Sequence, residues 1–189
     1  MLLYCYCISF ASCINNVEES EITTVKIDDS IRFVTQDTYY NQAYNEILDM
    51  LEGKRPYDFK RAVFLVEWAY LHEELNYEQY CTAIAQHASN LKKFIRNKGV
   101  EQYRTAGNYA LFEFFTQPNF MNGGMVYSYD FDDFSGEKDL TKVFVTKLMR
   151  TNTGQCSSLP TFYKILAEEI GAEAYLALAP MHMYIKHLD

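Results

Sequence analysis

The sequence predicts an α+β protein, in which a helical N-terminal half is followed by a back half with short strands. Two observations lead to this prediction. Between residues 37 and 116, apolar side chains recur every three or four positions, which is the spacing of helices with one buried face. After Gly171, two short apolar runs flank Pro180, which indicates an antiparallel strand pair.

The composition is that of a folded protein with a substantial core. Of the 189 residues, 49% are hydrophobic and 16% are aromatic, which excludes disorder as the global state. This length fits one domain with a short appendage. The formal net charge of -8 has the wrong sign for a protein that grips phosphate backbones, so nucleic acid is excluded as a partner.

The N-terminus resembles a secretion signal. Residues 2–12 are apolar but too short to span a bilayer as a helix, and the small residues before Cys13 resemble a relaxed bacterial lipobox. We therefore expect residues 1–13 to be a lipoprotein signal segment with Cys13 acylated, residues 14–36 to be a polar tether, and the protein to be secreted or anchored to the envelope. No Lys or Arg precedes the apolar run, so a misplaced start codon or a buried N-terminal strand remains open.

Four helices are expected in the region 37–124. Asp37 and Asp58 are suitable N-cap residues, and Gly53 and Gly99 follow apolar stripes as helix terminators. Pro, Asn and paired Gly over 118–124 predict a loop. The expected helices cover residues 37–53, 58–70, 76–98 and 101–116.

The back half, residues 125–189, contains both the spacing of helices and the alternation of strands. We expect a strand over 125–129, a solvated acidic loop over 130–138, and a helix in preference to a strand over 140–149. A clear amphipathic helix then follows Cys156 and ends at Gly171, with Pro160 tolerated in its first turn. Residues 174–179 and 183–188 are the expected strands.

Cys156 is the most informative position for chemistry. Unpaired amide groups and the helix dipole favour the thiolate at a helix start, and they also provide donors for an oxyanion. Gln155 is a candidate oxyanion donor beside it, or else a turn residue. His182, close to the last predicted strand, is the candidate base that accepts the thiol proton. Simple packing is the alternative role for both Cys156 and His182.

Three segments resemble the transglutaminase-like superfamily of papain-type thiol enzymes, particularly its small bacterial members. They are Thr153–Pro160 (TGQCSSLP), Tyr163–Ala172 (YKILAEEIGA) and Ala179–His187 (APMHMYIKH). The resemblance covers roughly residues 140–189. It implies a partial papain-like core over 125–189, with Cys156 as nucleophile at a helix start and His182 on the following strand.

Members of this family place a third residue, Asp or Asn, on the strand after the histidine strand, where it orients the imidazole. Asp189 is a poor substitute, because seven residues of extended chain would carry it more than about 20 Å from His182. We therefore expect the chain to be a C-terminally truncated piece. A dyad that works without an orienting residue and an inactive site are the alternatives.

The expected function is thiol-dependent acyl transfer, with hydrolysis of peptide or amide bonds implied by the bacterial relatives. The substrate would be a peptide or protein, no metal or organic cofactor is required, and membrane contact would come only from the lipid anchor. Asp130, Asp132, Asp133 and Glu137 miss the spacing of a calcium loop. The alternatives are a noncatalytic envelope module that binds peptide or protein, and a structural fragment.

Overall fold

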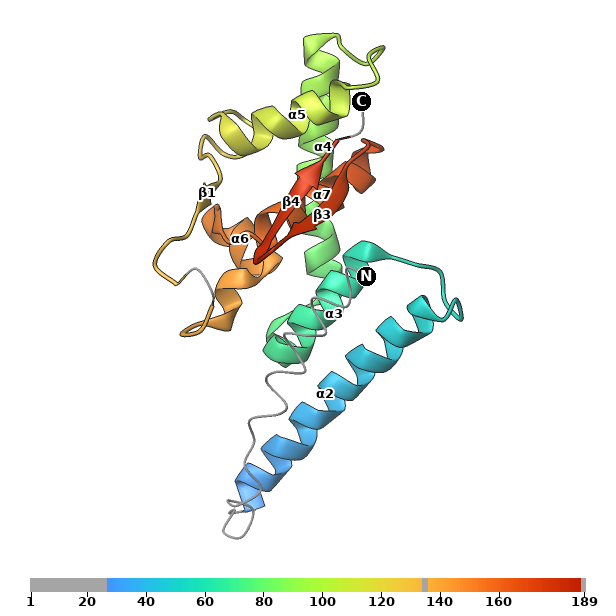
Figure 1. The fold of residues 1–189 in the computed structure, drawn as a ribbon, viewed down its shortest axis with the longest axis vertical. Coiled ribbons are helices and arrows are strands. Elements are labelled where there is room, and N and C mark those ends of the chain that lie inside the picture. The colour runs from blue at the N-terminus through green and yellow to red at the C-terminus, as the bar shows by residue number, and fades with distance from the viewer. Residues whose placement is uncertain (1–26, 134–135, 188–189) are drawn as a thin grey trace. The chain divides into compact units, whose positions relative to one another are not determined.

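The computed structural model describes residues 27–133 and 136–187, with side chains from Thr38 onwards. The protein is α+β and divides into two compact units, Met1–Asn76 and Tyr77–Asp189 (Figure 1). The predicted lipidation residue, Cys13, lies outside the described residues, as does Asp189. Among the described helices, none is both long and apolar enough to cross a membrane.

The first unit contains two packed helices, α2 (Ile27–Leu51) and α3 (Phe59–Leu71), and a 3-10 turn, η1 (His72–Glu74). α3 begins as predicted, because the Asp58 carboxylate accepts a hydrogen bond of 2.9 Å from the backbone N–H of Arg61. α2 begins ten residues before the predicted cap at Asp37. No Gly or Pro interrupts residues 27–51, so the helix includes part of the expected tether.

Buried apolar side chains and a bidentate ion pair join α2 to α3. Ala43, Ile47 and Met50 are buried on α2. The guanidinium of Arg61 donates to both carboxylate oxygens of Glu46, at 2.7 and 3.0 Å, and these hydrogen bonds lower the pKa of Glu46. Tyr44, predicted to lie on the buried face, is instead exposed.

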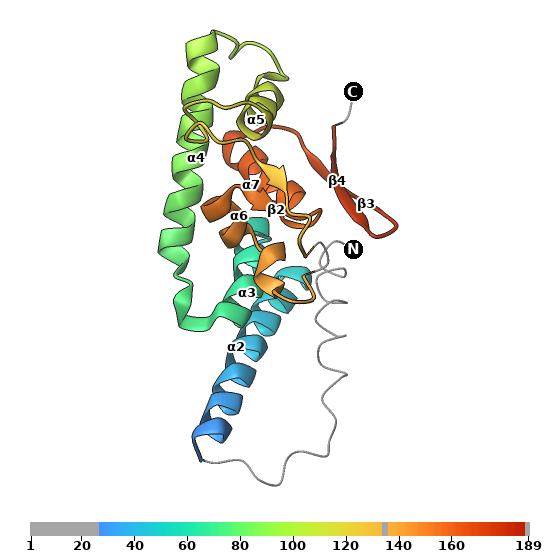
Figure 2. The ribbon, with the colours of Figure 1, turned by 90° about the vertical axis from the view of Figure 1, so that its left-hand side faces the viewer.

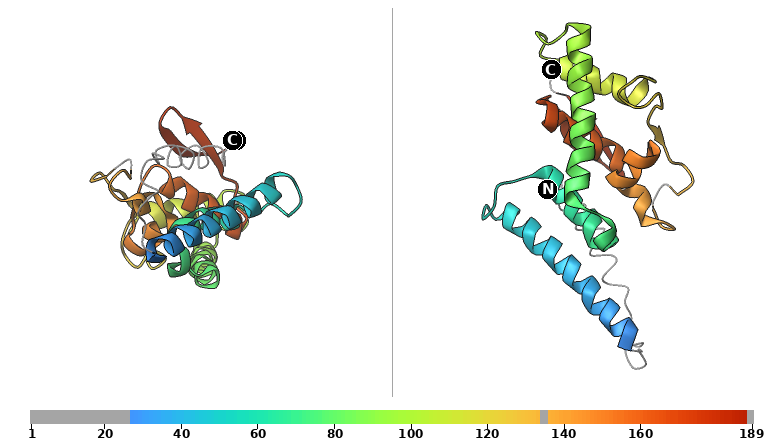
Figure 3. Two further views of the ribbon diagram at one scale, coloured as in Figure 1. Left: turned by 90° about the horizontal axis from the view of Figure 1, so that it is seen from below. Right: turned by 180° about the vertical axis from the view of Figure 1, so that it is seen from behind.

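The second unit has three layers. α4 (Tyr77–Lys98) forms one outer layer; α5 (Ala106–Thr116), α6 (Val145–Thr151) and α7 (Ser158–Ile170) form the middle. The hairpin of β3 (Tyr175–Ala179) and β4 (His182–Lys186) lies on the other side of α7 (Figures 2 and 3). The helix predicted after Cys156 is confirmed, and Gly171 ends it with a φ of 73°.

Aromatic rings fill the space between the helices of the second unit. Phe162 on α7 is fully buried, and its ring centroid lies 5.6 to 6.2 Å from those of His87, Phe114, Phe115 and Tyr127. α5 approaches the end of α7 closely, since a Cβ on Gly107 would lie 2.6 Å from the Cβ of Ala172. α5 begins at Ala106, five residues after the predicted start at residue 101.

Two predictions in the back half needed correction in detail. Residues 140–149 are helical as expected, but extended backbone at Phe144 divides them into a 3-10 turn, η2 (Leu140–Val143), and α6. The strand expected over 125–129 is reduced to β1 (Ser128–Tyr129), which pairs in parallel with β2 (Thr153–Gly154). The sequence did not indicate β2, because a strand of two residues is too short to show an alternating pattern.

The predicted strand pair is confirmed as the antiparallel hairpin β3–β4, with Ala179 opposite His182. Pro180 and Met181 form its turn, and Met181 has a left-handed φ of 56°. Along β4, Met183 and Ile185 are half-buried, whereas His182, Tyr184 and Lys186 are exposed. The hairpin therefore has one face towards the helices and one towards solvent.

Candidate functional site

Cys156 lies in the turn between β2 and α7. The turn is closed by a hydrogen bond of 3.1 Å from the N–H of Leu159 to the carbonyl oxygen of Gln155, and α7 begins two residues after the cysteine. The thiol is free and half-buried. Cys156 therefore lies within one turn of the start of α7, close to the predicted position at the start of a helix.

Gly154 allows this turn to form. A Cβ at this position would lie 2.7 Å from Oγ of Ser158 and 2.8 Å from Cδ1 of Leu148, both of which are fully buried. Oγ of Ser158 accepts a hydrogen bond of 2.9 Å from the N–H of Gln155. The strand, the turn and the helix are thus locked together immediately before Cys156.

Tyr129 lies near the turn that carries Cys156. The β1–β2 pairing sets Tyr129 opposite Gly154, two residues before the cysteine. The pKa of Tyr129 is raised, first by burial and then by the charge of, and hydrogen bond to, the Cys156 sulfur. The backbone N–H of Cys156 acts in the opposite direction.

Gln155 is fully buried, and its side chain is engaged elsewhere. Its Nε2 donates to the carbonyl oxygens of Asp130 and Asp133, both at 2.9 Å. Its Oε1 is buried with no partner among the described residues. Since both amide hydrogens are used, an oxyanion at Cys156 would depend on backbone amides in this conformation.

The acidic loop after β1 is folded around its own carboxylates, which differs from the predicted solvated loop. Asp133 is buried and accepts hydrogen bonds of 3.1, 3.0 and 2.9 Å from the N–H groups of Glu137, Lys138 and Asp139. Asp130 binds Nζ of Lys147 at 2.9 Å. In the described part of the chain, no group of His, Cys, Asp and Glu is arranged to hold a metal ion.

These carboxylates predict a loss of stability in acid. Burial raises the pKa of Asp133, but the three N–H donors lower it by more, so the pKa lies below the ordinary 3.8. The hydrogen bond from Lys147 likewise lowers the pKa of Asp130 below 3.8. Their stabilisation is present above pH 3.8 and is lost as the pH falls through the folded-state values. Urea unfolding at pH 5 and pH 3 should show this loss.

The control for the acid effect is Asp133→Asn, which keeps the size of the side chain and removes its charge. The free energy of unfolding of this variant is expected to fall less between pH 5 and pH 3 than that of the unsubstituted chain. Equal losses in the two proteins would show that Asp133 does not contribute to the acid sensitivity.

His182 is exposed at the beginning of β4, next to the hairpin turn. Among the described residues, its ring makes no hydrogen bond to Sγ of Cys156 or to any other group. The structure therefore places Tyr129 beside the turn of Cys156 and leaves the imidazole of His182 in solvent. The pairing of Cys156 with His182 remains a prediction from the sequence.

His187 follows the last residue of β4 and is exposed, as is His182. Its Nε2 lies 3.3 Å from the hydroxyl of Tyr163 and its Nδ1 lies 3.1 Å from the carbonyl oxygen of Glu173. These contacts attach the end of the hairpin to α7 and to the segment that follows it.

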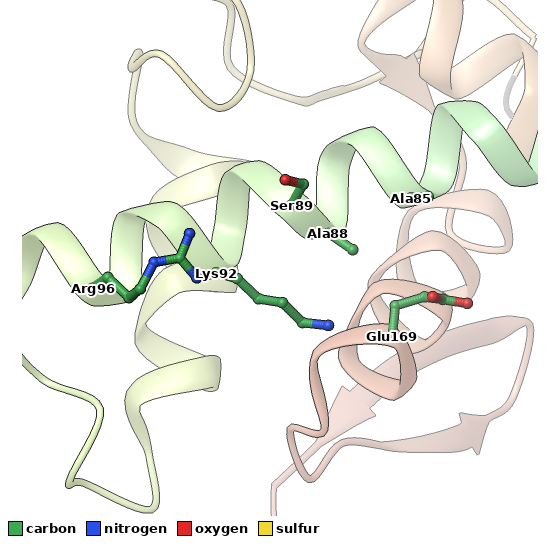
Figure 4. Close-up of a pocket in the computed structure, with 6 residues that line it drawn as sticks. All are labelled: Ala85, Ala88, Ser89, Lys92, Arg96 and Glu169. Atoms are coloured by element: carbon green, nitrogen blue, oxygen red, sulfur yellow. The ribbon is translucent and has the colours of Figure 1, made fainter.

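A separate hollow of about 220 Å³ lies between α4 and α7. Its wall includes Lys92 and Arg96 on successive turns of α4 and Glu169 on α7 (Figure 4). Lys92 and Arg96 are exposed, which agrees with the solvated helix face predicted for them. The hollow shares no lining residue with the turn that carries Cys156.

Sequence analysis missed Tyr129, Lys147 and the buried role of Asp133. Lys147 donates to Asp130 and also to the carbonyl and hydroxyl oxygens of Thr153, so it ties the acidic loop to β2. The bond from Lys147 to Asp130 joins residues 17 positions apart, which no local pattern records. The bonds of Asp133 are local, to N–H groups four to six residues further along the chain.

The chain was also compared with known proteins. No family model, curated protein or solved structure matches it.

Proposed function

We propose that this protein is a thiol-dependent acyl-transfer enzyme of transglutaminase-like type, which hydrolyses peptide or amide bonds with Cys156 as nucleophile and His182 as base. The partial papain-like core over 125–189 is part of this proposal. The resemblance of the segments around Cys156 and His182 to that superfamily supports it.

The observation that carries the proposal is the setting of Cys156. Its free, half-buried sulfur lies in a strand–turn–helix connection, one turn from the start of α7. The first amides of a helix have no intrahelical acceptor, and they can stabilise negative charge on sulfur or on an oxyanion.

The reaction would proceed through a thioester. The Cys156 thiol transfers its proton to His182, the sulfur bonds to the amide carbonyl carbon, and the C–N bond then breaks as the imidazolium gives its proton to the leaving amine. Water attacks the thioester next, which releases the acid and restores the thiol. His182 must approach Cys156 for these transfers. It begins β4 directly after the turn of the hairpin, and the two strands of the hairpin pack against α7 (Figure 2).

The test is site-resolved alkylation of the full-length chain. With iodoacetamide at pH 5.5, Cys156 is expected to react faster than Cys81. His182→Ala is expected to slow the labelling of Cys156 roughly a hundredfold, the lower end of general-base effects. His187→Ala is the matched control, since this exposed histidine follows β4 at the end of the hairpin opposite to the turn. Equal, slow labelling of both cysteines in every variant would contradict the proposal.

A noncatalytic module that binds peptide or protein is the second candidate function. The exposed imidazole of His182, with no hydrogen bond to Cys156 within the described chain, favours it. This alternative predicts that His182→Ala leaves the labelling of Cys156 unchanged, and that no amide bond is cleaved.

We also propose that the protein is anchored to a bacterial envelope through Cys13. Incorporation of radiolabelled palmitate into the full-length chain is the measurement. Cys13→Ala is expected to remove the label, whereas Cys81→Ala is expected to leave it in place. Label retained in Cys13→Ala would refute the anchor.

A further inference from the structure

The end of α4 concentrates positive charge in a chain that is acidic as a whole. Four exposed basic residues occupy the last two turns of this helix: Lys92, Lys93, Arg96 and Lys98. The segment 92–124 contains five basic and two acidic residues, whereas the chain has 17 basic and 25 acidic ones. The charge of this segment is therefore opposite in sign to that of the whole protein.

Aromatic rings lie among these lysines. Nζ of Lys98 lies over the ring of Phe94, 5.3 Å from its centroid, and Nζ of Lys93 lies over the ring of Phe120, at 5.7 Å. Phe94 is buried, and its centroid is 6.4 Å from that of Phe120 and 5.6 Å from that of Tyr109 on α5. These five residues form one connected cluster, the basic–aromatic patch, to which α4, α5 and the loop after α5 contribute (Figure 2).

The rings at the edge of the patch are open to solvent. Phe120 is 50% exposed and Tyr109 is 39% exposed. Phe112, which is also exposed, follows Tyr109 by three residues on α5, so the two rings share one side of the helix. Exposed aromatic rings beside Lys and Arg are typical of surfaces that lie at the boundary between water and lipid headgroups.

We propose that the basic–aromatic patch binds the surface of a membrane that contains anionic phospholipids. The ammonium groups of Lys93 and Lys98 pair with lipid phosphates, and the rings of Phe120 and Tyr109 enter the headgroup region. This inference goes beyond the proposed function, and it depends neither on Cys156 as a nucleophile nor on acylation of Cys13.

The charged neighbours leave the patch positive. Among the described residues, neither lysine of the patch forms an ion pair. The two acidic residues of the segment are Glu101, in the turn after α4, and Glu113, which is half-buried on α5. Arg104, the fifth basic residue, pairs with Glu173 at 3.2 Å. An anionic membrane is thus complementary in charge to this end of the second unit, although it repels the protein as a whole.

The positive surface continues around α4 towards α7. Lys92 and Arg96 line the hollow between these two helices, opposite Glu169 (Figure 4). Lys92 and Arg96 are four residues apart and have the same charge, an arrangement that destabilises an isolated helix. An anionic surface would relieve this repulsion.

Single-stranded nucleic acid also combines phosphates with groups that stack on rings, but it fits the patch less well. Bases stack on the open face of an aromatic ring. The ring of Phe120 is already contacted by Lys93 and by Phe94, and Phe94 is itself buried. Contact with lipid headgroups requires no such open face, so the membrane is favoured.

The test is flotation of the full-length chain with lipid vesicles in about 0.1 M salt, where charges interact over about 10 Å. A Cys13→Ala background removes any contribution of an acyl anchor. Vesicles with about 30% phosphatidylglycerol in phosphatidylcholine are expected to bind the protein roughly tenfold more tightly than phosphatidylcholine alone. Equal binding to both kinds of vesicle, or binding to neither, would overturn the proposal.

The combined substitution Lys93→Gln and Lys98→Gln is expected to weaken binding to the anionic vesicles roughly 25-fold, since each Lys near such a surface contributes about fivefold in affinity. Lys138→Gln with Lys186→Gln is the matched control, because it removes the same charge from exposed lysines outside the patch. This control is expected to change the affinity by no more than about twofold. Equal losses in the two double variants would attribute binding to net charge and would refute a role for the patch.

Two substitutions of Phe120 test whether the rings enter the headgroup region. Phe120→Ala is expected to weaken vesicle binding roughly fivefold, the effect of burying the exposed half of a Phe ring. Phe120→Trp keeps an aromatic ring in place and is expected to strengthen binding, because Trp is enriched at the membrane interface. Unchanged affinity in both variants would contradict the proposal.

A fluorescent oligothymidylate serves as the alternative probe in a parallel titration. The full-length chain is expected not to bind it. Binding of this oligonucleotide that is lost in the Lys93→Gln and Lys98→Gln variant, without binding to anionic vesicles, would assign the patch to nucleic acid and would overturn the membrane proposal.

Discussion

Phe162→Ala is expected to lower the free energy of unfolding by about 3–5 kcal/mol, the range for deletion of a buried aromatic side chain. Phe162 has no exposed surface, and its ring is enclosed by rings from α4, α5 and the segment before β1. Truncation at Cβ would remove this burial and leave a cavity that rigid neighbours cannot close. Urea unfolding of the full-length chain measures the loss.

Phe112→Ala is the matched control for this substitution. Phe112 is on α5 and is 57% exposed, so little apolar surface is lost when its ring is removed. Its free energy of unfolding is expected to change by no more than about 0.5 kcal/mol. Similar losses for the two variants would show that the rings around Phe162 do not form the core of the second unit.

Gln155→Ala is expected to lower the free energy of unfolding by about 1–3 kcal/mol, and to slow the alkylation of Cys156. The substitution leaves the carbonyl oxygen of Asp130 without its Gln155 donor and the carbonyl oxygen of Asp133 with the N–H of Gly136 alone. An unpaired buried group costs roughly 1–3 kcal/mol. Removal of the unpartnered Oε1 offsets part of this cost. Urea unfolding and labelling at pH 5.5 measure the two effects.

The effects of Gln155→Ala on stability and on labelling, taken together, distinguish two roles for Gln155. If its amide holds the acidic loop against the turn of Cys156, stability and thiol labelling fall together. If instead it acted only as an oxyanion donor, amide hydrolysis would fall while stability and labelling remained unchanged. Gln102→Ala is the control, because Gln102 is exposed in the turn before α5 and its loss should change stability by no more than about 0.5 kcal/mol.

The acidic loop connects these expectations to the candidate site. Gln155 binds its carbonyls, Lys147 binds Asp130 and β2, and Asp133 folds the loop on itself. The loop is bound to Gln155, which directly precedes Cys156, so we expect the stability of the loop and the reactivity of the thiol to fall together when Gln155 is replaced.

Much of the fold could be predicted from the sequence, because the decisive signals are local. Apolar spacing located α3, α4 and α7, Asp58 and Gly171 marked two helix ends, and Pro180 marked the turn of the β3–β4 hairpin. These features depend on residues within a few turns of one another. The position of Cys156 next to the start of α7 was predicted for the same reason.

Only the tertiary structure decided what surrounds that cysteine. A two-residue parallel pairing sets Tyr129 opposite Gly154, beside the turn of Cys156. Gln155 donates to carbonyl oxygens of the acidic loop, because buried carbonyls must find donors. Such contacts join segments 20 or more residues apart, as the separation of Gln155 from Asp133 illustrates, and no periodic pattern records them. The sequence alone determined where the thiol lies along the chain, and packing determined what lies beside it.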